Sequence, residues 1–216
     1  MIFEVFDASM DLRITEGKLP HWFQPGVTYF ITWRTDDSIP RDVLDLWVRR
    51  RDDWLRRHGI DPLAPRWSAR LDELPNCQQH EFHATFSREF LEYLDRGYGA
   101  CVLRRTELAA IVADSLRHFD GQRYVLADFV VMPNHVHLQA CLLGATDVQE
   151  QCYSWKKFTA TKINRVLGQR GRFWHEESFD HLVRTPEYFG HFRRYIADNG
   201  NQAGLSPQDY LHWSRE

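Results

Sequence analysis

The spacing of apolar and polar residues along the chain predicts a mixture of strands and helices. Runs that are rich in β-branched and aromatic residues, or that alternate in polarity, predict strands at 27–33, 124–131 and 135–143, with a partly extended segment over 172–183. Apolar residues at helical spacing predict helices at 40–57, 87–94, 106–119, 147–167 and 185–199. Met132-Pro133-Asn134 is a tight connection, so the two strands around it form a hairpin.

This order of elements predicts an α+β fold. Strand, helix, two hairpin strands, helix and short strand is the order of a ferredoxin-like split β-α-β antiparallel sheet with helices on one face. We expect one domain over residues 1–216, with a core formed by 27–34 and 101–200. Residues 40–100 are then a helical N-terminal insertion to which the sequence assigns no role, and 201–216 are a C-terminal tail.

Two histidines on the second hairpin strand are the first candidate for chemistry. Side chains alternate between the two faces of a strand, so His135, His137 and Gln139 point to one face. The apolar residues between them, such as Val136 and Leu138, point to the other face and into the core. Two imidazoles at this spacing can converge on one metal ion or one phosphate, although His-x-His pairs also occur as hydrogen-bonded surface pairs and in zinc sites.

The last predicted helix carries a second set of polar residues. Tyr195 and Asn199 are four positions apart, so they lie one turn apart on the same helix face. The adjacent Arg193 and Arg194 are expected to favour the phenolate of Tyr195 and to attract phosphate. The alternative is that Tyr195 is an aromatic core residue.

Together these residues suggest a phosphoryl-transfer site. A divalent ion, Mg²⁺ or Mn²⁺, held by His135, His137 and the amide oxygen of Asn199 would polarise a phosphate and offset its charge. Tyr195 would attack phosphorus, leaving a covalent phosphotyrosine and a free 3′-hydroxyl.

The segment Val130–Leu138 (Val-Val-Met-Pro-Asn-His-Val-His-Leu) resembles the His-hydrophobic-His (HUH) motif of single-tyrosine transposases. The chain most resembles the REP-associated tyrosine transposases, relatives of the insertion-sequence transposases that act on single-stranded DNA. The likeness covers roughly 97–213 and the first strand, through these further segments: 154–160, 173–174, 179–180, 194–196 with Asn199, and 203–205.

The resemblance implies a metal-dependent single-stranded DNA endonuclease and strand transferase that cleaves hairpin or palindromic DNA. It assigns metal binding to His135 and His137, the nucleophile to Tyr195, and an amide-type third ligand to Asn199. The chain departs from the family at Gly200, where the family usually has proline. We expect this change to affect only how the helix ends.

Charge is unevenly distributed along the chain, which bears on nucleic-acid binding. The net charge is −3, yet the 41 residues from Ser154 to Arg194 hold nine basic and four acidic side chains. A basic stretch in an acidic protein is a candidate phosphate-binding surface, although a solvated helix face would look the same. The residues expected to contact phosphates are Lys156, Lys157, Arg172, Arg184, Arg193 and Arg194, and Trp174 is expected to stack on unpaired bases.

Composition adds a cellular setting. The chain is 43% hydrophobic and 26% charged, without an apolar run long enough to cross a membrane, and its four cysteines form no Cys-x-x-Cys pair. We therefore expect a cytoplasmic, nucleoid-associated protein with reduced thiols, whose partner is single-stranded or hairpin DNA and not a membrane. A homodimer and a monomer both remain possible.

Two other functions fit part of the sequence. A DNA-binding remnant of a transposase would keep the scaffold without catalysis. A histidine-triad-type nucleotidyl transferase would use His135-Val136-His137-Leu138-Gln139 with the middle histidine as nucleophile, and would need neither Tyr195 nor metal. It would leave unexplained the Trp-Lys-Lys-Phe-Thr-Ala and Tyr-Ile-x-x-Asn segments downstream of the histidines.

Overall fold

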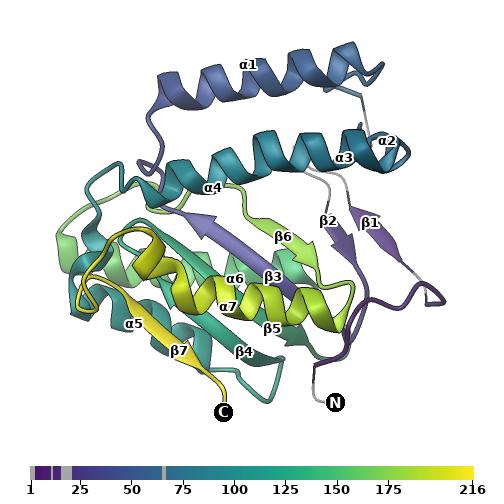
Figure 1. The fold of residues 1–216 in the computed structure, drawn as a ribbon. Helices are drawn as coiled ribbons and strands as arrows, with labels where there is room; N and C mark the ends of the chain where they lie inside the picture. The colour runs from purple at the N-terminus through teal and green to yellow at the C-terminus, as the bar shows by residue number, and fades with distance from the viewer. Residues whose placement is uncertain (1–2, 11, 16–20, 65–66) are drawn as a thin grey trace.

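A five-stranded antiparallel sheet forms the centre of the computed structural model, which describes residues 3–10, 12–15, 21–64 and 67–216 (Figure 1). Its strands are β3 (Thr28–Arg34), β4 (Tyr124–Val131), β5 (His135–Leu142), β6 (Phe179–Leu182) and β7 (Leu211–Ser214), in the order β6-β3-β5-β4-β7. A separate pair, β1 (Arg13–Thr15) and β2 (His21–Phe23), precedes them. The first four strands of the sheet have the order of a split β-α-β fold, so the predicted fold class is confirmed.

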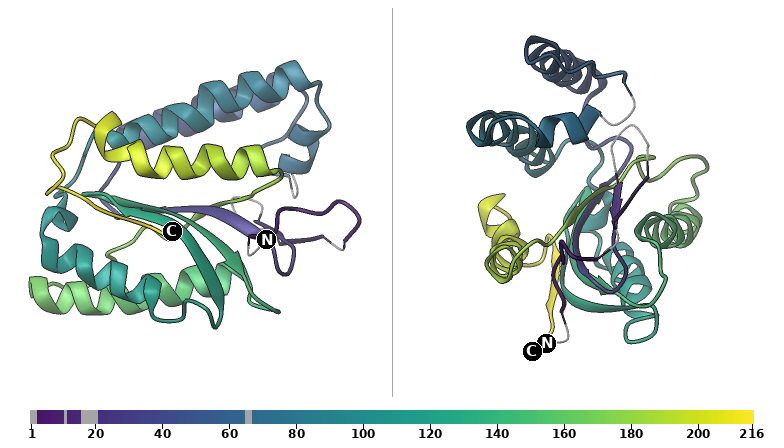
Figure 2. Two further views of the ribbon diagram at one scale, coloured as in Figure 1. Left: turned by 60° about the horizontal axis from the view of Figure 1, so that its bottom comes forward. Right: turned by 90° about the vertical axis from the view of Figure 1, so that its right-hand side faces the viewer.

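The described residues form seven α-helices around this sheet. They are α1 (Arg41–Arg57), α2 (Trp67–Asp72), α3 (Asn76–Phe82), α4 (Arg88–Asp95), α5 (Thr106–Arg117), α6 (Val148–Leu167) and α7 (Pro186–Gln202). Figure 2 shows α5 and α6 on one side of the sheet and α7 on the other, with α1 to α4 beyond α7. The expectation of helices on one face therefore holds for α5 and α6 only. The helix that carries Tyr195 covers the opposite face, because that face also has an apolar patch to bury.

The main core lies between the sheet and helices α5 and α6. The inward residues of β5, Val136, Leu138, Ala140 and Leu142, are fully buried there, as their alternation predicts. Trp33 of β3 stacks on Trp155 of α6, with ring centroids 5.7 Å apart. A smaller cluster on the other face joins Phe30, Val130 and Met132 of the sheet region to Ile196 of α7.

Helices α1 to α4 lie in segment 40–100, which the sequence analysis expects to be an insertion, and they have a core of their own. Their shared cluster is made of Trp54, Leu55, Ile60, Trp67, Leu71, Phe82 and Phe86. A π-helical turn, His83–Ser87, joins α3 to α4. The end of α4 is attached to the sheet by Asn134, whose amide nitrogen donates to the carbonyls of Leu94 at 3.3 Å and Tyr98 at 3.0 Å. The insertion therefore ends next to the start of β5.

The segment expected to be a C-terminal tail contributes a strand. β7 pairs antiparallel with β4, and Arg193 of α7 lies 3.1 Å from the buried carboxylate of Asp128 on β4. Helix α7 also continues beyond Asn199-Gly200, where the sequence predicts its end. A Cβ at Gly200 would lie 2.2 Å from the Tyr210 ring, so this glycine allows the segment before β7 to pack closely on the helix.

Within the described ranges, no helix combines the length and the apolar character that crossing a membrane requires.

Candidate metal and tyrosine site

His135 and His137 lie on the face of the sheet that α7 covers, and both are fully buried. The Nδ1 atom of His137 is 2.7 Å from Oγ1 of Thr32, its partner on β3. The Nδ1 atom of His135 is 2.8 Å from Oδ1 of Asn134. Because the amide nitrogen of Asn134 donates to α4, its oxygen accepts, and we assign the His135 proton to Nδ1. Neighbours that hold Nδ1 orient an imidazole so that Nε2 is available to a metal.

Burial keeps both imidazoles neutral. It lowers the pKa of His135 to about 3, and it lowers the pKa of His137 well below its usual value, with His135 as a second cause. Neutral imidazole is the form that binds a metal ion. The two histidines are therefore ready to act as ligands at physiological pH.

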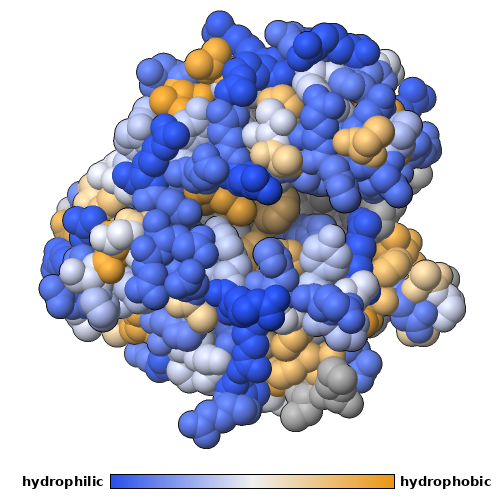
Figure 3. Space-filling model, viewed as in Figure 1, coloured by the Kyte–Doolittle hydropathy of each residue, from blue (hydrophilic) through white to orange (hydrophobic). Residues whose placement is uncertain are grey.

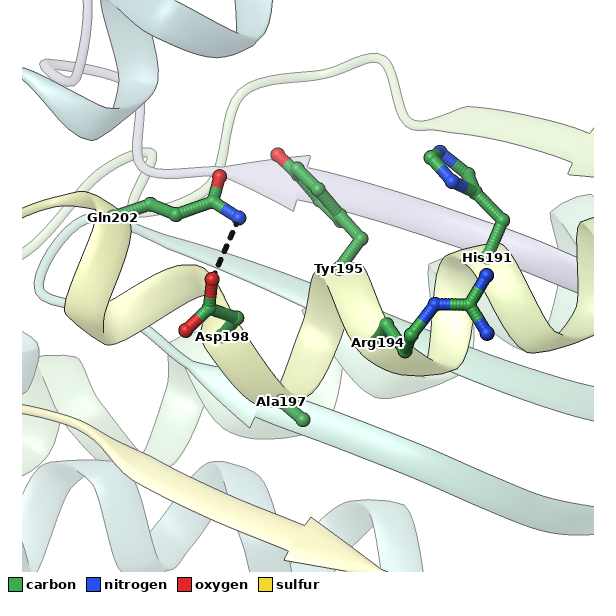
Figure 4. Close-up of a pocket in the computed structure, with 6 residues that line it drawn as sticks. All are labelled: His191, Arg194, Tyr195, Ala197, Asp198 and Gln202. Atoms are coloured by element: carbon green, nitrogen blue, oxygen red, sulfur yellow. Dashed lines mark hydrogen bonds between the residues drawn. The ribbon is translucent and has the colours of Figure 1, made fainter.

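Tyr195 reaches the same place from α7. Its hydroxyl oxygen is 3.5 Å from Nε2 of His137, and its ring meets the His137 ring edge-on with centroids 5.2 Å apart. The ring also contacts Phe30 on β3, with centroids 5.9 Å apart, which fixes its direction. Figure 4 shows Tyr195 and His191 extending from the same side of α7, in a groove of about 480 Å³ that Arg194 also lines.

The phenol of Tyr195 is held in its protonated form. Burial raises its pKa, the charge of Asp95 raises it further, and nearby Asn199 partly opposes this. The expectation that Arg193 and Arg194 favour the phenolate is therefore wrong for this structure. Arg193 turns to Asp128, and Arg194 is exposed to solvent.

Asn199 is fully buried one turn after Tyr195, as predicted. Its side chain lies beside His135, Asp95 and Tyr195. Among the residues that the structure describes, neither its amide oxygen nor its amide nitrogen has a hydrogen-bond partner of normal geometry.

Asp95 is the residue of this site that the sequence analysis missed. It is the last residue of α4, and its Oδ1 lies 3.7 Å from Nε2 of His135. One ligand atom from each of Asp95, His135 and His137 lies within 4.8 Å of the other two. Burial raises the pKa of Asp95 to about 6, with a smaller contribution from Glu92. An acid at the end of a helix in a segment without an assigned role gives no sequence signal.

Unpartnered buried atoms show that a cation fits here. Across the described part of the chain, three acceptor atoms are buried without a hydrogen bond: Oδ1 of Asp95, Nε2 of His135 and the amide oxygen of Asn199. Each such atom costs about 1–3 kcal/mol when it is left unsatisfied. Imidazole nitrogen together with carboxylate and amide oxygen is a donor set that divalent metals accept. The cluster is therefore a candidate metal site.

The predicted DNA-contacting residues fall into two groups. Lys156 and Lys157 lie on α6, so the sheet separates them from Tyr195, and Nζ of Lys156 donates to the carbonyl of Glu176 at 2.7 Å. Arg172 is exposed in the loop after α6. The residues on the site's own face are Arg184, which precedes α7 and is close to His181 and His83, and Arg194 in the Tyr195 groove.

Trp174 does not fit its predicted role. It is 4% exposed, its indole nitrogen donates to Oγ1 of Thr159 at 2.8 Å, and its ring packs edge-on against Trp33. A ring enclosed in this way offers no face to a base, so the prediction of base stacking is wrong in this structure. The indole instead joins the segment before β6 to α6.

Comparison with known proteins finds a similar solved structure. The fold is similar to that of a REP-associated tyrosine transposase bound to a REP hairpin. The two chains are 15% identical, the similarity covers 91% of this chain and 90% of the other, and the TM-score is 0.43. No protein-family model and no curated protein matches the chain. The similar structure belongs to the family that the sequence motifs resemble.

Proposed function

We propose that this protein is a metal-dependent single-stranded DNA endonuclease and strand transferase that uses Tyr195 as its nucleophile. The observation that carries the proposal is the position of the Tyr195 hydroxyl, 3.5 Å from Nε2 of His137 and beside the unpartnered atoms of His135 and Asn199. A tyrosine that served only as a core residue would not need a histidine nitrogen and unpartnered polar atoms beside its hydroxyl. We further propose that the protein acts in the cytoplasm on hairpin or palindromic DNA of the nucleoid.

The metal would be held by His135, His137 and Asn199. A bound Mg²⁺ or Mn²⁺ supplies a positive charge that polarises the scissile phosphate and stabilises its transition state. The protein's contribution is the orientation of the ligands, because Thr32 and Asn134 fix the two imidazoles through Nδ1.

Tyr195 carries the covalent step. Its oxygen attacks phosphorus and gives up its proton to water, the bond from phosphorus to the 3′ oxygen breaks, and the departing 3′ oxygen takes a proton from water to become a 3′-hydroxyl. The reverse attack by a 3′-hydroxyl on the phosphotyrosine restores a phosphodiester, which is strand transfer. Burial keeps the phenol protonated before substrate binds, so the nucleophile is not active in the free protein. One chain supplies all of these side chains, so the reaction as proposed needs no second copy.

The surface around Tyr195 suits an unpaired strand. Arg194 lines the same groove and is exposed, as a phosphate contact must be. Tyr188 and Phe179 are among the exposed large aromatic residues, at 50% and 37%. The Tyr188 ring contacts Phe192, and the Phe179 ring contacts His181, which in turn contacts Phe192. Phe192 stacks on Phe30, and Phe30 contacts Tyr195. Exposed aromatic rings near an exposed arginine are typical of single-strand binding, since every base has a face that can stack.

The test is covalent capture of labelled single-stranded hairpin DNA in the presence of Mg²⁺ or Mn²⁺. Wild-type protein should give a denaturant-resistant protein–DNA band, and Tyr195→Phe or a chelator should abolish the band while DNA binding survives. Tyr195→Phe removes only the hydroxyl and keeps the ring contacts with Phe30 and His137. The variant is therefore expected to fold like wild type, so that loss of the band reports on the hydroxyl.

Three outcomes would contradict the proposal. A band that persists in Tyr195→Phe would show that another residue is the nucleophile. Binding of hairpins without any band would indicate a DNA-binding protein without cleavage activity. Absence of binding would favour nucleotidyl transfer.

A further inference from the structure

We infer that Asp95 is a further ligand of the same metal ion, so that the helical insertion completes the metal site. The inference rests on the proposed function, because it concerns the metal site of that reaction. It gives the α1–α4 insertion, to which the sequence assigns no role, a direct part in the chemistry.

The distance between Asp95 and His135 is the first argument. Oδ1 of Asp95 lies 3.7 Å from Nε2 of His135, which is too long for a hydrogen bond. The His135 proton is on Nδ1, where it is donated to Asn134, so Nε2 presents a lone pair to the carboxylate oxygen. Two electron-pair donors that face each other in a buried place repel one another, and a cation between them turns that repulsion into attraction. The ligand atom of His137 lies within the same 4.8 Å cluster.

The way in which both ligands are held is the second argument. Asn134 accepts from His135 through its oxygen and donates through its nitrogen to the carbonyls of Leu94 and Tyr98, on either side of Asp95. One buried side chain therefore sets the position of both groups. Orientation by a shared neighbour is a common feature of metal ligands.

A small cavity beside the two ligands is the third argument. It has a volume of about 110 Å³ and is lined by Asp95, His135, Asn134 and Arg104, among others. A water molecule occupies roughly 30 Å³ of liquid, so the cavity has room for a few waters. Mg²⁺ and Mn²⁺ keep several waters when they bind to proteins, so this space next to the carboxylate suits them.

The carboxylate also predicts which ions the site prefers. Without Asp95, two imidazoles and an amide remain, and imidazole-rich sites favour Zn²⁺ and Ni²⁺. With Asp95 the site has a hard, charged oxygen, which suits Mg²⁺ and Mn²⁺. Loss of the carboxylate should therefore weaken Mn²⁺ binding more than Zn²⁺ binding.

The test is Mn²⁺ binding to the full chain without DNA, measured by electron paramagnetic resonance and calorimetry. Asp95→Asn should weaken Mn²⁺ binding by about 100-fold, the upper end of the losses seen even for residues that only support a metal ligand. The affinity of Asp95→Glu for Mn²⁺ should lie between that of wild-type protein and that of Asp95→Asn. Glu92→Gln is the matched control, since it removes one acidic charge from the same turn of α4 at an exposed position. It should weaken binding by less than about fivefold.

A second measurement does not depend on the variants folding. In wild-type crystals soaked with Mn²⁺, the anomalous peak should lie at a coordination distance of roughly 2.0–2.3 Å from an oxygen of Asp95. A peak held by the histidines with Asp95 turned away would overturn the inference. So would wild-type affinity in Asp95→Asn.

The result also separates this inference from the proposed function. If Asp95→Asn binds Mn²⁺ like wild type while His137→Ala does not bind it, only the role of Asp95 falls. If wild-type protein binds no Mn²⁺, both the inference and the metal dependence of the proposed reaction fall.

Discussion

The two faces of the central sheet are built on different principles. On the face that α5 and α6 cover, β5 contributes Val136 and Leu138 to the main hydrophobic core. On the face that α7 covers, the same strand contributes His135 and His137, which are equally buried but lie beside polar atoms without partners. Alternation along one strand thus gives a stabilising face and a candidate reactive face, the one that carries His135 and His137. The candidate reactive face holds costly groups because the other face supplies the stability.

The largest expected effects are on stability and on activity, and they distinguish the adjacent residues Leu138 and His137 of β5. Leu138→Ala should cost about 2–5 kcal/mol of unfolding free energy, because it leaves a cavity in the main core. His137→Ala should cost less stability, because a buried polar ring is removed as well, but it should slow DNA cleavage by about 10³-fold or more through the loss of a metal ligand. Urea denaturation and covalent-capture assays on both variants measure the two effects. Equal losses of stability and activity in both would contradict the division between the faces.

The next comparison is between adjacent arginines on α7. Arg193→Ala should lower the unfolding free energy by about 2 kcal/mol, because it strips the buried Asp128 of its charged partner. This is less than a fully buried pair would cost, since the Arg193 side chain is 41% exposed. Arg194→Ala should change stability by less than about 0.5 kcal/mol.

DNA binding should be weakened more by Arg194→Ala than by Arg193→Ala. Loss of Arg194 should weaken binding to single strands and reduce the salt dependence of the affinity by about one phosphate contact. Fluorescence anisotropy at several salt concentrations measures this. If Arg193→Ala weakens binding more than Arg194→Ala in folded protein, the assignment of the two arginines is wrong.

The last comparison concerns the dependence of stability on pH. Burial lowers the pKa of His181 to about 4, with Arg184 as a further cause, and it lowers that of His135 to about 3. Between about pH 6.5 and these values the unfolded chain takes up protons that the folded chain does not. Stability should therefore be full above about pH 6.5 and should fall as the pH drops towards 4.

His181→Gln isolates one contribution to this slope. His181 lies on the candidate reactive face, where its ring meets that of Phe192 at 5.7 Å between centroids. The variant should lose less stability than wild type between pH 7.5 and pH 5 in urea denaturation, and the exposed His191→Gln is the control. An unchanged slope in His181→Gln would show that burial of this imidazole does not contribute.

Local patterns predicted most of the fold. The bounds expected for the two hairpin strands and for helices α1, α4, α5 and α6 agree with the structure to within two residues at each end. The alternation along β5 placed His135 and His137 on one face, and the four-residue spacing placed Tyr195 and Asn199 on one side of α7. These features follow from the geometry of a single strand or helix, which a short stretch of residues specifies.

Contacts between distant segments were missed. Asp95 lies at the end of a helix in the insertion, and only the docking of α4 on Asn134 brings it to His135. Trp174 looks exposed in a polar stretch of sequence, yet the bridge between Thr35 and Trp174 and the bond to Thr159 enclose it. Arg193 looks like a phosphate contact, yet the buried Asp128 binds it. In each case the partner comes from a distant segment.

The sequence by itself pointed to most of the candidate side chains of the site and determined which neighbours share a face, because backbone geometry repeats every two residues in a strand and about every four in a helix. Tertiary structure decided which of these side chains meet. It put α7 across the sheet from α5 and α6, closed the site with Asp95, and turned Arg193 and Trp174 into structural residues. The physical reason is that burial and pairing depend on the packing of whole elements, which no short window of sequence contains.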